Sequence, residues 1–221
     1  MNRTCIVILA LAFVLVSCAS SPSNSTSIAA VDGRQATPDT NESFVDFQVE
    51  DIQISVPRPD GWESFTTDPG IVIAETISSV ADEGELDGLV MHVYVPVLED
   101  LPLPAVDGDN IAQQILQQIV EDPNYTGSAS INGPFAFDWN DYDSAYYLFN
   151  NGDVSIVIGV ALPGTTRIIA CSVSAPVAEA DRIRAMLPRL LNGVRINGIE
   201  LDGGVLEDLP NPLVFPVFPE G

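Results

Sequence analysis

Residues 144–174 read SAYYLFNNGDVSIVIGVALPGTTRIIACSVS. Three apolar stretches, 144–149, 154–162 and 166–174, are rich in β-branched and aromatic residues, which favour strands. The two connections, Asn-Asn-Gly-Asp and Pro-Gly-Thr, have the composition of tight turns. Because strands joined by short turns pair in antiparallel fashion, this stretch predicts an antiparallel meander and sets the fold class.

The chain before this meander contains further strand patterns. Residues 44–49 and 52–56 alternate apolar and polar side chains around a Glu-Asp turn, which predicts a hairpin. Pro57-Arg58-Pro59-Asp60-Gly61-Trp62 then ends the second strand, because proline cannot donate to a strand ladder. More strands are predicted at 70–77, 86–98 and 129–137.

Two amphipathic helices complete the expected fold. Asp109 is a candidate cap for a helix that carries an apolar stripe through residues 111–120, opposite a face of glutamines, and Pro123 follows soon after. A second helix is expected from Pro176 to Leu191, although Pro188 allows a kink or an early end. Residues 194–201 return as a short strand. The prediction is therefore a single α+β domain over 44–201, an antiparallel β-sheet flanked by the two helices.

Residues 202–221 form a proline-rich, apolar C-terminal tail for which an extended, polyproline-like conformation is expected. Three alternatives stay open: the tail packs back onto the domain, it docks on a partner, or it is disordered.

The amino terminus has the pattern of a bacterial export signal. A short basic segment precedes the apolar run 6–16, which is too short to span a bilayer comfortably. Leu15-Val16-Ser17-Cys18 matches a lipobox, so we expect cleavage after Ser17 and lipidation of Cys18. Cleavage after Ala19 by ordinary signal peptidase and an uncleaved anchor are the two alternatives.

The sequence thus predicts a signal peptide at 1–17 and a tether at 18–43. The tether is rich in Ser, Thr, Asn, Pro and Ala and has too little apolar surface to fold. The folded domain would then be anchored to the cell membrane through lipid, facing outside the cytoplasm. The outer membrane is an alternative location if the cell has two membranes.

The charge of the chain limits its partners. Its 221 residues hold 31 acidic and 8 basic residues, all arginine, for a formal net charge of −23. This field repels nucleic acid, so we expect no nucleic-acid partner. Since 46% of the residues are hydrophobic, the chain can still bury a sizeable core.

Residue types needed for chemistry are scarce. His92 is the only histidine and lies in a predicted strand, and Cys171, in an apolar stretch, is expected to be a buried and inert thiol. No Gly-x-Ser-x-Gly turn, phosphate-binding glycine loop or zinc-ligand set is present. Acidic groups at 82–87, 107–110 and 138–143 lack the spacing of a calcium loop. We predict no catalytic, cofactor-binding or metal-binding residue.

One stretch resembles a known family. Ile54-Ser55-Val56-Pro57-Arg58-Pro59-Asp60-Gly61-Trp62 is a strand that runs into a P-x-P-x-G-W turn; Met91 to Val95, the glutamine-rich helix and Phe137-Asp138-Trp139-Asn140-Asp141-Tyr142 follow. This order resembles the PsbP-like lipoproteins, including the actinobacterial LpqN-type group, over residues 44–201. The resemblance implies a sheet sandwiched by helices and a domain that binds or assists other proteins, usually without catalysis.

These observations favour a non-catalytic domain that binds a protein or a small ligand at the cell envelope. The expected contact surface comprises Arg58, Asp60, Trp62, Trp139 and Tyr142. Two other functions stay open: an extracytoplasmic hydrolase that acts through paired carboxylates, and a calcium-dependent binding module.

Overall fold

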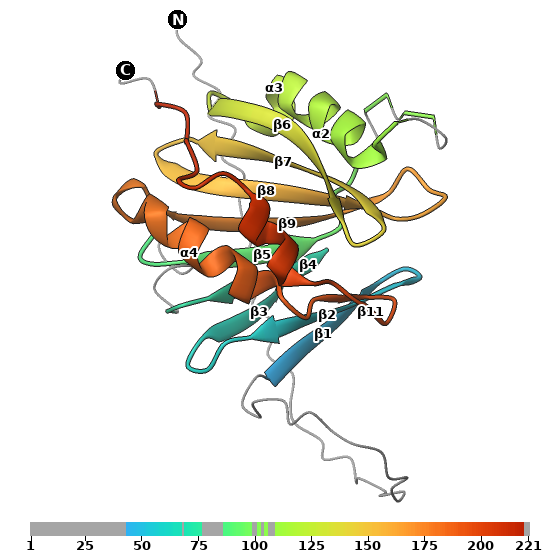
Figure 1. Cartoon of the computed structure of the whole chain (residues 1–221), viewed down its shortest axis with the longest axis horizontal. Coiled ribbons are helices and arrows are strands. Elements are labelled where there is room, and N and C mark those ends of the chain that lie inside the picture. The colour runs from blue at the N-terminus through green and yellow to red at the C-terminus, as the bar shows by residue number, and fades with distance from the viewer. Residues whose placement is uncertain are drawn as a thin grey trace, which may run out of the picture. The chain divides into compact units, whose positions relative to one another are not determined.

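The structure is a computed structural model that describes residues 43–67, 69–76, 86–98, 101–102, 104–105 and 109–218. The predicted signal peptide, Cys18 and all of the predicted tether except Ser43 lie outside the described residues. The described part is an α+β arrangement in which every strand pairing is antiparallel, as predicted from the meander (Figure 1).

The larger of two sheets has seven strands. Their order across the sheet is β3 (Glu63–Thr67), β4 (Gly70–Ala74), β5 (Val90–Tyr94), β9 (Ile168–Pro176), β8 (Asp153–Ala161), β7 (Tyr142–Asn150) and β6 (Ser130–Trp139). The meander predicted from residues 144–174 is present as β7, β8 and β9. Strand β3 was not predicted, and β5 is shorter than the predicted strand at 86–98.

The predicted hairpin belongs to a separate four-stranded sheet. Its order is β1 (Ser43–Val49), β2 (Ile52–Arg58), β10 (Arg195–Ile196) and β11 (Ile199–Glu200). The chain leaves this sheet at a turn in which the Trp62 N–H donates to the Pro59 carbonyl, 3.1 Å away, and Gly61 has a φ of 81°. Residues 194–201 were predicted as one strand. They form a hairpin of two two-residue strands instead, because Asn197-Gly198 reverses the chain.

Helix α2 (Ile111–Glu121) lies where the apolar stripe predicts it, but its cap differs. Asn110, not Asp109, is the N-cap, and its Oδ1 accepts a hydrogen bond of 2.9 Å from the Gln113 N–H. Asp143 Oδ2 accepts from the Ile111 N–H at 3.0 Å, so a strand residue completes the cap. The short α3 (Pro123–Thr126) follows directly, which agrees with Pro123 ending α2.

Helix α4 (Ala180–Leu191) follows a 3-10 turn, η1 (Val177–Glu179), and continues past Pro188. After β11 the chain forms a second 3-10 helix, η2 (Gly203–Asp208), and then runs without regular structure through Phe218. The first part of the tail is thus helical, whereas an extended conformation was predicted.

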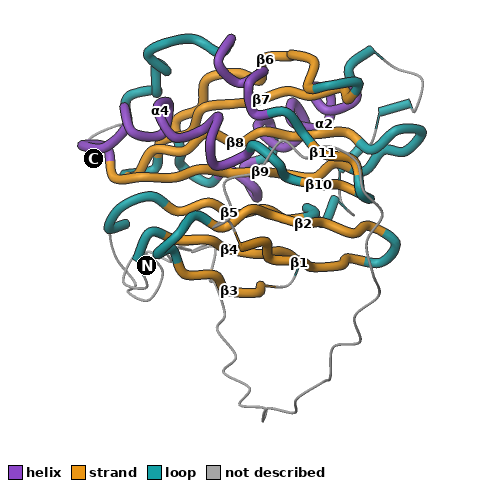
Figure 2. Tube along the Cα trace, turned by 60° about the horizontal axis from the view of Figure 1, so that its bottom comes forward, coloured by secondary structure: helices purple, strands orange, loops and turns teal. Residues whose placement is uncertain are grey.

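Two apolar cores lie on opposite faces of the seven-stranded sheet. Figures 1 and 2 show the strands of this sheet and the helices that pack on it. Alternate residues of β7 separate the two cores: Ala145 and Tyr147 face α2, whereas Tyr146 and Leu148 face the core that α4 and the four-stranded sheet share. Both helices therefore flank the sheet as predicted. Leu206, Leu209 and Leu213 belong to the core that α4 and the four-stranded sheet share. The C-terminal tail therefore packs back onto the domain, which is the first of the three alternatives given for it.

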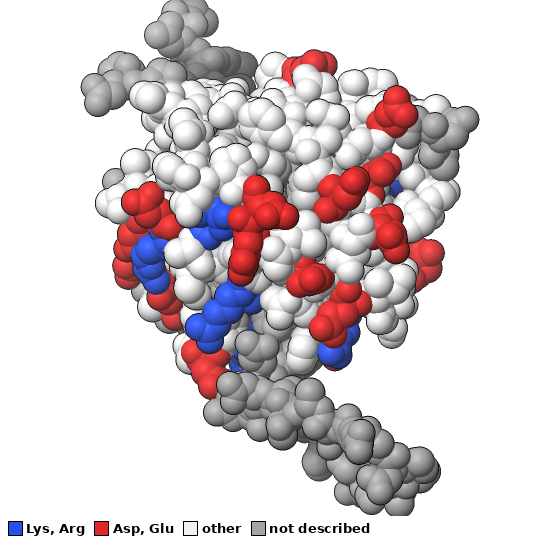
Figure 3. Space-filling view, in the orientation of Figure 1, with Lys and Arg blue, Asp and Glu red and all other residues white. Residues whose placement is uncertain are grey.

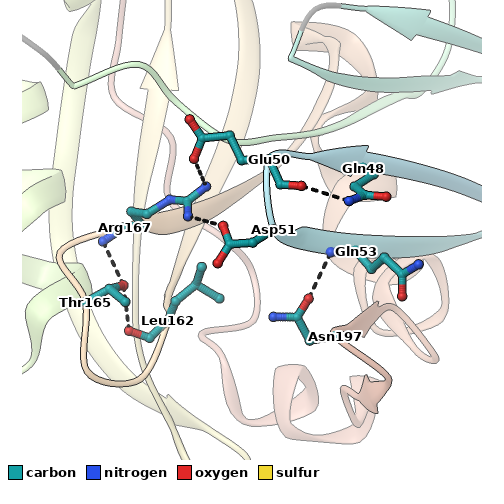
Figure 4. A network of polar contacts seen from close by, with 8 residues as sticks. All are labelled: Gln48, Glu50, Asp51, Gln53, Leu162, Thr165, Arg167 and Asn197. Atoms are coloured by element: carbon teal, nitrogen blue, oxygen red, sulfur yellow. Dashed lines mark hydrogen bonds and ion pairs between the residues drawn. The ribbon is translucent and has the colours of Figure 1, made fainter.

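A polar network joins the two sheets at one end (Figure 4). Arg167, beside the β8–β9 turn, forms ion pairs with Glu50 at 3.0 Å and Asp51 at 2.6 Å in the β1–β2 turn. The Arg167 guanidinium lowers the pKa of the Asp51 carboxyl. Asn197, in the turn between β10 and β11, also contacts the β1–β2 hairpin. Its Oδ1 accepts a hydrogen bond of 2.9 Å from the Gln53 N–H.

Candidate functional site

The structure corrects part of the expected contact surface. Trp139 is fully buried, and its Nε1–H donates to the Asp202 carbonyl at 2.8 Å. Tyr142, 6% exposed, belongs to the same core. The side chains pack here because β6 and β7 turn them toward α4 and η2, so neither residue offers a contact surface.

The other half of the expected surface, the turn at residues 58–62, is accessible in part. Asp60 is exposed, whereas Trp62 is half-buried against the core. Arg58 is also half-buried, and its Nε donates to Ser43 Oγ at 2.9 Å. The turn therefore presents Asp60 to solvent, while Arg58 and Trp62 make local contacts.

A ladder of aromatic rings leads from the buried Trp139 to the surface. Phe137 lies 6.2 Å from Trp139 and 6.0 Å from Tyr146 between ring centroids, and Phe135 lies 5.3 Å from Tyr146. Phe135 ends the ladder with 41% of its surface exposed. An exposed ring that rests on buried rings is a rigid apolar platform, which suits it to contact a ligand or a partner.

This platform forms one wall of a groove of about 430 Å³. The wall from the sheet consists of Asn132, Phe135, Ala136, Phe137, Tyr146 and Leu148. The opposite wall comes from η2 and the tail and consists of Asp208, Leu209, Pro210, Leu213 and Val214. Most of the lining is apolar, and two polar side chains, Asn132 and Asp208, lie among it.

The groove depends on an irregularity in β6 that was not predicted from the sequence. Asn132 pairs with Leu148 and Phe135 pairs with Tyr146, so Gly133 and Pro134 together oppose one residue of β7. This bulge shifts the alternation of side chains along β6 by one residue. It therefore places Asn132 and Phe135 on the same face of the sheet. The Gly-Pro pair inside a predicted strand was the available signal, since both residues mark bulges.

Charge around the groove is uneven. In Figure 3 acidic and basic side chains intermingle over α4 and η2, while the upper left of the view, where the tail rises toward its end, shows none among the residues described. Val214 on the tail wall is 67% exposed and Val217 86% exposed. Exposed apolar side chains on an uncharged part of so acidic a chain are a feature of interaction surfaces.

Residues suited to catalysis lie outside the groove lining: His92 is half-buried in β5, and Cys171 is fully buried in β9. Burial lowers the pKa of His92 to about 4, and its Nε2 lies 3.3 Å from Thr67 Oγ1. Burial raises the pKa of the Cys171 thiol to about 12, which agrees with the inert thiol predicted.

The acidic group at 138–143 has structural roles. Asp143 caps α2, and Asn140, with a φ of 57°, accepts a hydrogen bond from the Asp202 N–H. Asp138 and Asp141 are exposed. Within the described residues no three His, Cys, Asp or Glu side chains gather to hold a metal ion. Residues 82–85 and 107–108 of the other acidic groups lie outside the described residues.

No protein-family model and no curated protein matches the chain. Among solved structures, the Ran-binding protein Mog1p of Saccharomyces cerevisiae is similar at 13% identity, with a TM-score of 0.39 over 66% of this chain and 82% of that one. A cyanobacterial PsbP from Synechocystis is similar at 12% identity, with a TM-score of 0.43 over 73% of this chain and 97% of that one. PsbP is the family that the sequence resembles, but likenesses with TM-scores below 0.5 assign neither a function nor a partner.

The helices in the described ranges are all too short, or too polar, to cross a bilayer.

Proposed function

We propose that this protein is a membrane-anchored, extracytoplasmic lipoprotein whose domain is a non-catalytic binding module. The anchor rests on the sequence alone: Leu15-Val16-Ser17-Cys18 follows an apolar run of signal length and precedes a polar tether. Lipid on Cys18 would hold the domain at the cell membrane and leave it free to meet other envelope proteins.

The binding site that we propose is the groove between the β6–β7 platform and the tail. The observation that carries this proposal is the exposed Phe135 ring, supported from behind by Tyr146 and Phe137 and faced by the exposed Val214. A groove of this size and lining accepts apolar side chains of an extended protein segment.

The charge of the domain indicates the flanks of that segment. Asp208 lies in the groove lining, and the exposed Glu207 precedes it. With a formal net charge of −23, the chain favours a partner whose apolar segment is bordered by basic residues.

Site-specific crosslinking in native membranes tests the site. A photo-reactive amino acid at Phe135 should crosslink to an apolar, base-flanked segment of one envelope protein. The same label at Val177, an exposed apolar residue outside the groove lining, is the control. Equal crosslinking from both positions would refute the proposed site.

The anchor has its own test. Labelled fatty acid should be incorporated into the unmodified chain and not into Cys18→Ala, which should also leave the membrane fraction. A Cys18→Ala chain that still carries label would refute lipidation at this residue.

A further inference from the structure

The hydrogen bonds that tie the C-terminal tail to the domain run to its main chain. Arg184 of α4 donates to the carbonyls of Glu207, Leu209 and Pro210 at 2.8, 3.0 and 3.0 Å. Further along, Asn132 donates to the Val214 carbonyl at 3.3 Å and Asn150 to the Pro216 carbonyl at 2.7 Å. All five contacts run from side chains of the domain to carbonyl oxygens, which every peptide has.

The composition of the tail explains why carbonyls are the contact points. Pro210, Pro212 and Pro216 have no N–H group, so carbonyls outnumber N–H groups in this segment. From Leu209 to Phe218 the chain has neither helix nor strand. Arginine and asparagine donors beside an aromatic platform suit an extended, proline-rich segment of this kind.

Two leucines anchor the segment in the core, and Phe215 packs against the core half-buried. Leu209 and Leu213 are 7% and 8% exposed, whereas the residues between them are exposed. The groove lies along one flank of this segment, and a second, more polar hollow of about 660 Å³, bordered by Arg184 and Asn211, lies along the other. A competing segment can therefore approach the tail from both sides.

We propose that the site binds proline-rich, extended segments through their main-chain carbonyls and that the tail occupies it as an internal ligand. This inference rests on the proposed function and narrows its ligand to one class. In the free domain residues 209–218 close the groove as its second wall. A partner's segment would displace them, lie against the Phe135 platform in their place and take over the bonds from Arg184, Asn132 and Asn150.

The test uses the full chain with its own tail loosened and a fluorescent peptide of residues 209–218 as the probe. Leu213→Asp removes one tail anchor and leaves Arg184, Asn132 and Asn150 unchanged. We expect the peptide to bind this chain at least tenfold more tightly than the unmodified chain, whose tail competes at high effective concentration. Leu213→Ala, with a milder loss, gives the same comparison if Leu213→Asp does not fold by circular dichroism.

Two further arms test the mode of recognition. Arg184→Ala in the Leu213→Asp chain should weaken peptide binding at least tenfold, whereas Arg189→Ala, which removes an exposed arginine from the same helix, should leave it within twofold. A peptide whose prolines are replaced by alanine should bind at least fivefold more weakly.

The outcomes separate this inference from the proposed function. If the alanine peptide binds as tightly as the proline peptide and binding is lost in Phe135→Asp but not in Arg184→Ala, the groove remains the site and the proline-rich class is wrong. If neither peptide binds a folded Leu213→Asp or Leu213→Ala chain, the inference is overturned, while crosslinking from Phe135 in membranes still decides the proposed function.

Discussion

The indole of Trp139 and the main chain of Asp202 are joined by a hydrogen bond of 2.8 Å that connects the end of β6 to the start of the C-terminal tail. Trp139 has no exposed surface, and the Asp202 N–H donates to Asn140 Oδ1 at 3.1 Å. The residues around the β6–β7 turn therefore determine where the tail begins, and with it the position of the second wall of the groove.

Replacing Trp139 with phenylalanine should lower the free energy of unfolding by about 3 kcal/mol. The change removes the indole donor to the Asp202 carbonyl and part of a fully packed side chain. Urea unfolding followed by circular dichroism measures the loss. Trp62→Phe, at a half-buried position, should cost less than about 1 kcal/mol. Equal losses at the two positions would contradict the role given to the Asp202 contact.

Gly203 should not tolerate a side chain. A Cβ at this position would lie 2.1 Å from the Pro188 carbonyl oxygen and 2.7 Å from Asn192 Cβ, so η2 would have to move away from α4. We expect Gly203→Ala to cost about 3 kcal/mol of unfolding free energy and to loosen the tail, seen as faster amide exchange over residues 205–215. Gly204→Ala is the matched control, since its Cβ meets only the Asp202 side chain. Unchanged exchange in Gly203→Ala would contradict this account.

The sequence was sufficient to predict those helices and strands whose local pattern agrees with their packing in the fold. Strands β7, β8 and β9 and helices α2 and α4 were predicted close to their observed positions, because apolar periodicity and turn residues specify them locally. The division into two sheets was not predicted. Period-two alternation shows that 52–56 is a strand, but pairing of β2 with β10 joins residues about 140 positions apart, which no local pattern encodes.

The candidate site was predicted only in outline. Trp139 and Tyr142 were expected at the contact surface but are core, and the accessible ring is Phe135, which was not predicted. Alternation cannot show which residues face the groove, because the bulge at Gly133 and Pro134 changes the phase of the strand. The tail wall follows from tertiary contacts of Arg184, Asn132 and Asn150, which sequence spacing does not reveal.

Cys171 should be almost unreactive in the folded protein. It has no exposed surface, and burial raises the pKa of its thiol to about 12, so the nucleophilic thiolate is scarce at neutral pH. In a chain with Cys5 and Cys18 replaced by serine, labelling at pH 8 should be slower than in denaturant by on the order of a thousandfold. An added cysteine at the exposed Val177 should label rapidly and serves as the control. Fast native labelling at Cys171 would show that the core opens readily.

His92 should make the protein less stable as the pH falls from 7 to 5. Burial lowers the pKa of the folded imidazole to about 4, whereas the unfolded side chain keeps its ordinary value of about 6.5. The unfolded state therefore binds the proton first, and the stability present above pH 6.5 is lost progressively as the pH falls toward 4. The size of the shift gives a loss of about 2 kcal/mol between pH 7 and pH 5.

The measurement is the free energy of unfolding of the unmodified chain and of His92→Gln at a series of pH values. Carboxylates also titrate toward the lower end of this range, but they contribute equally to both chains, so the difference between the two curves isolates His92. Glutamine can still reach Thr67 Oγ1, which limits the loss at pH 7. The difference should shrink by about 2 kcal/mol on going to pH 5. Parallel curves would mean that the His92 imidazole is protonated in the folded protein as easily as in the unfolded chain.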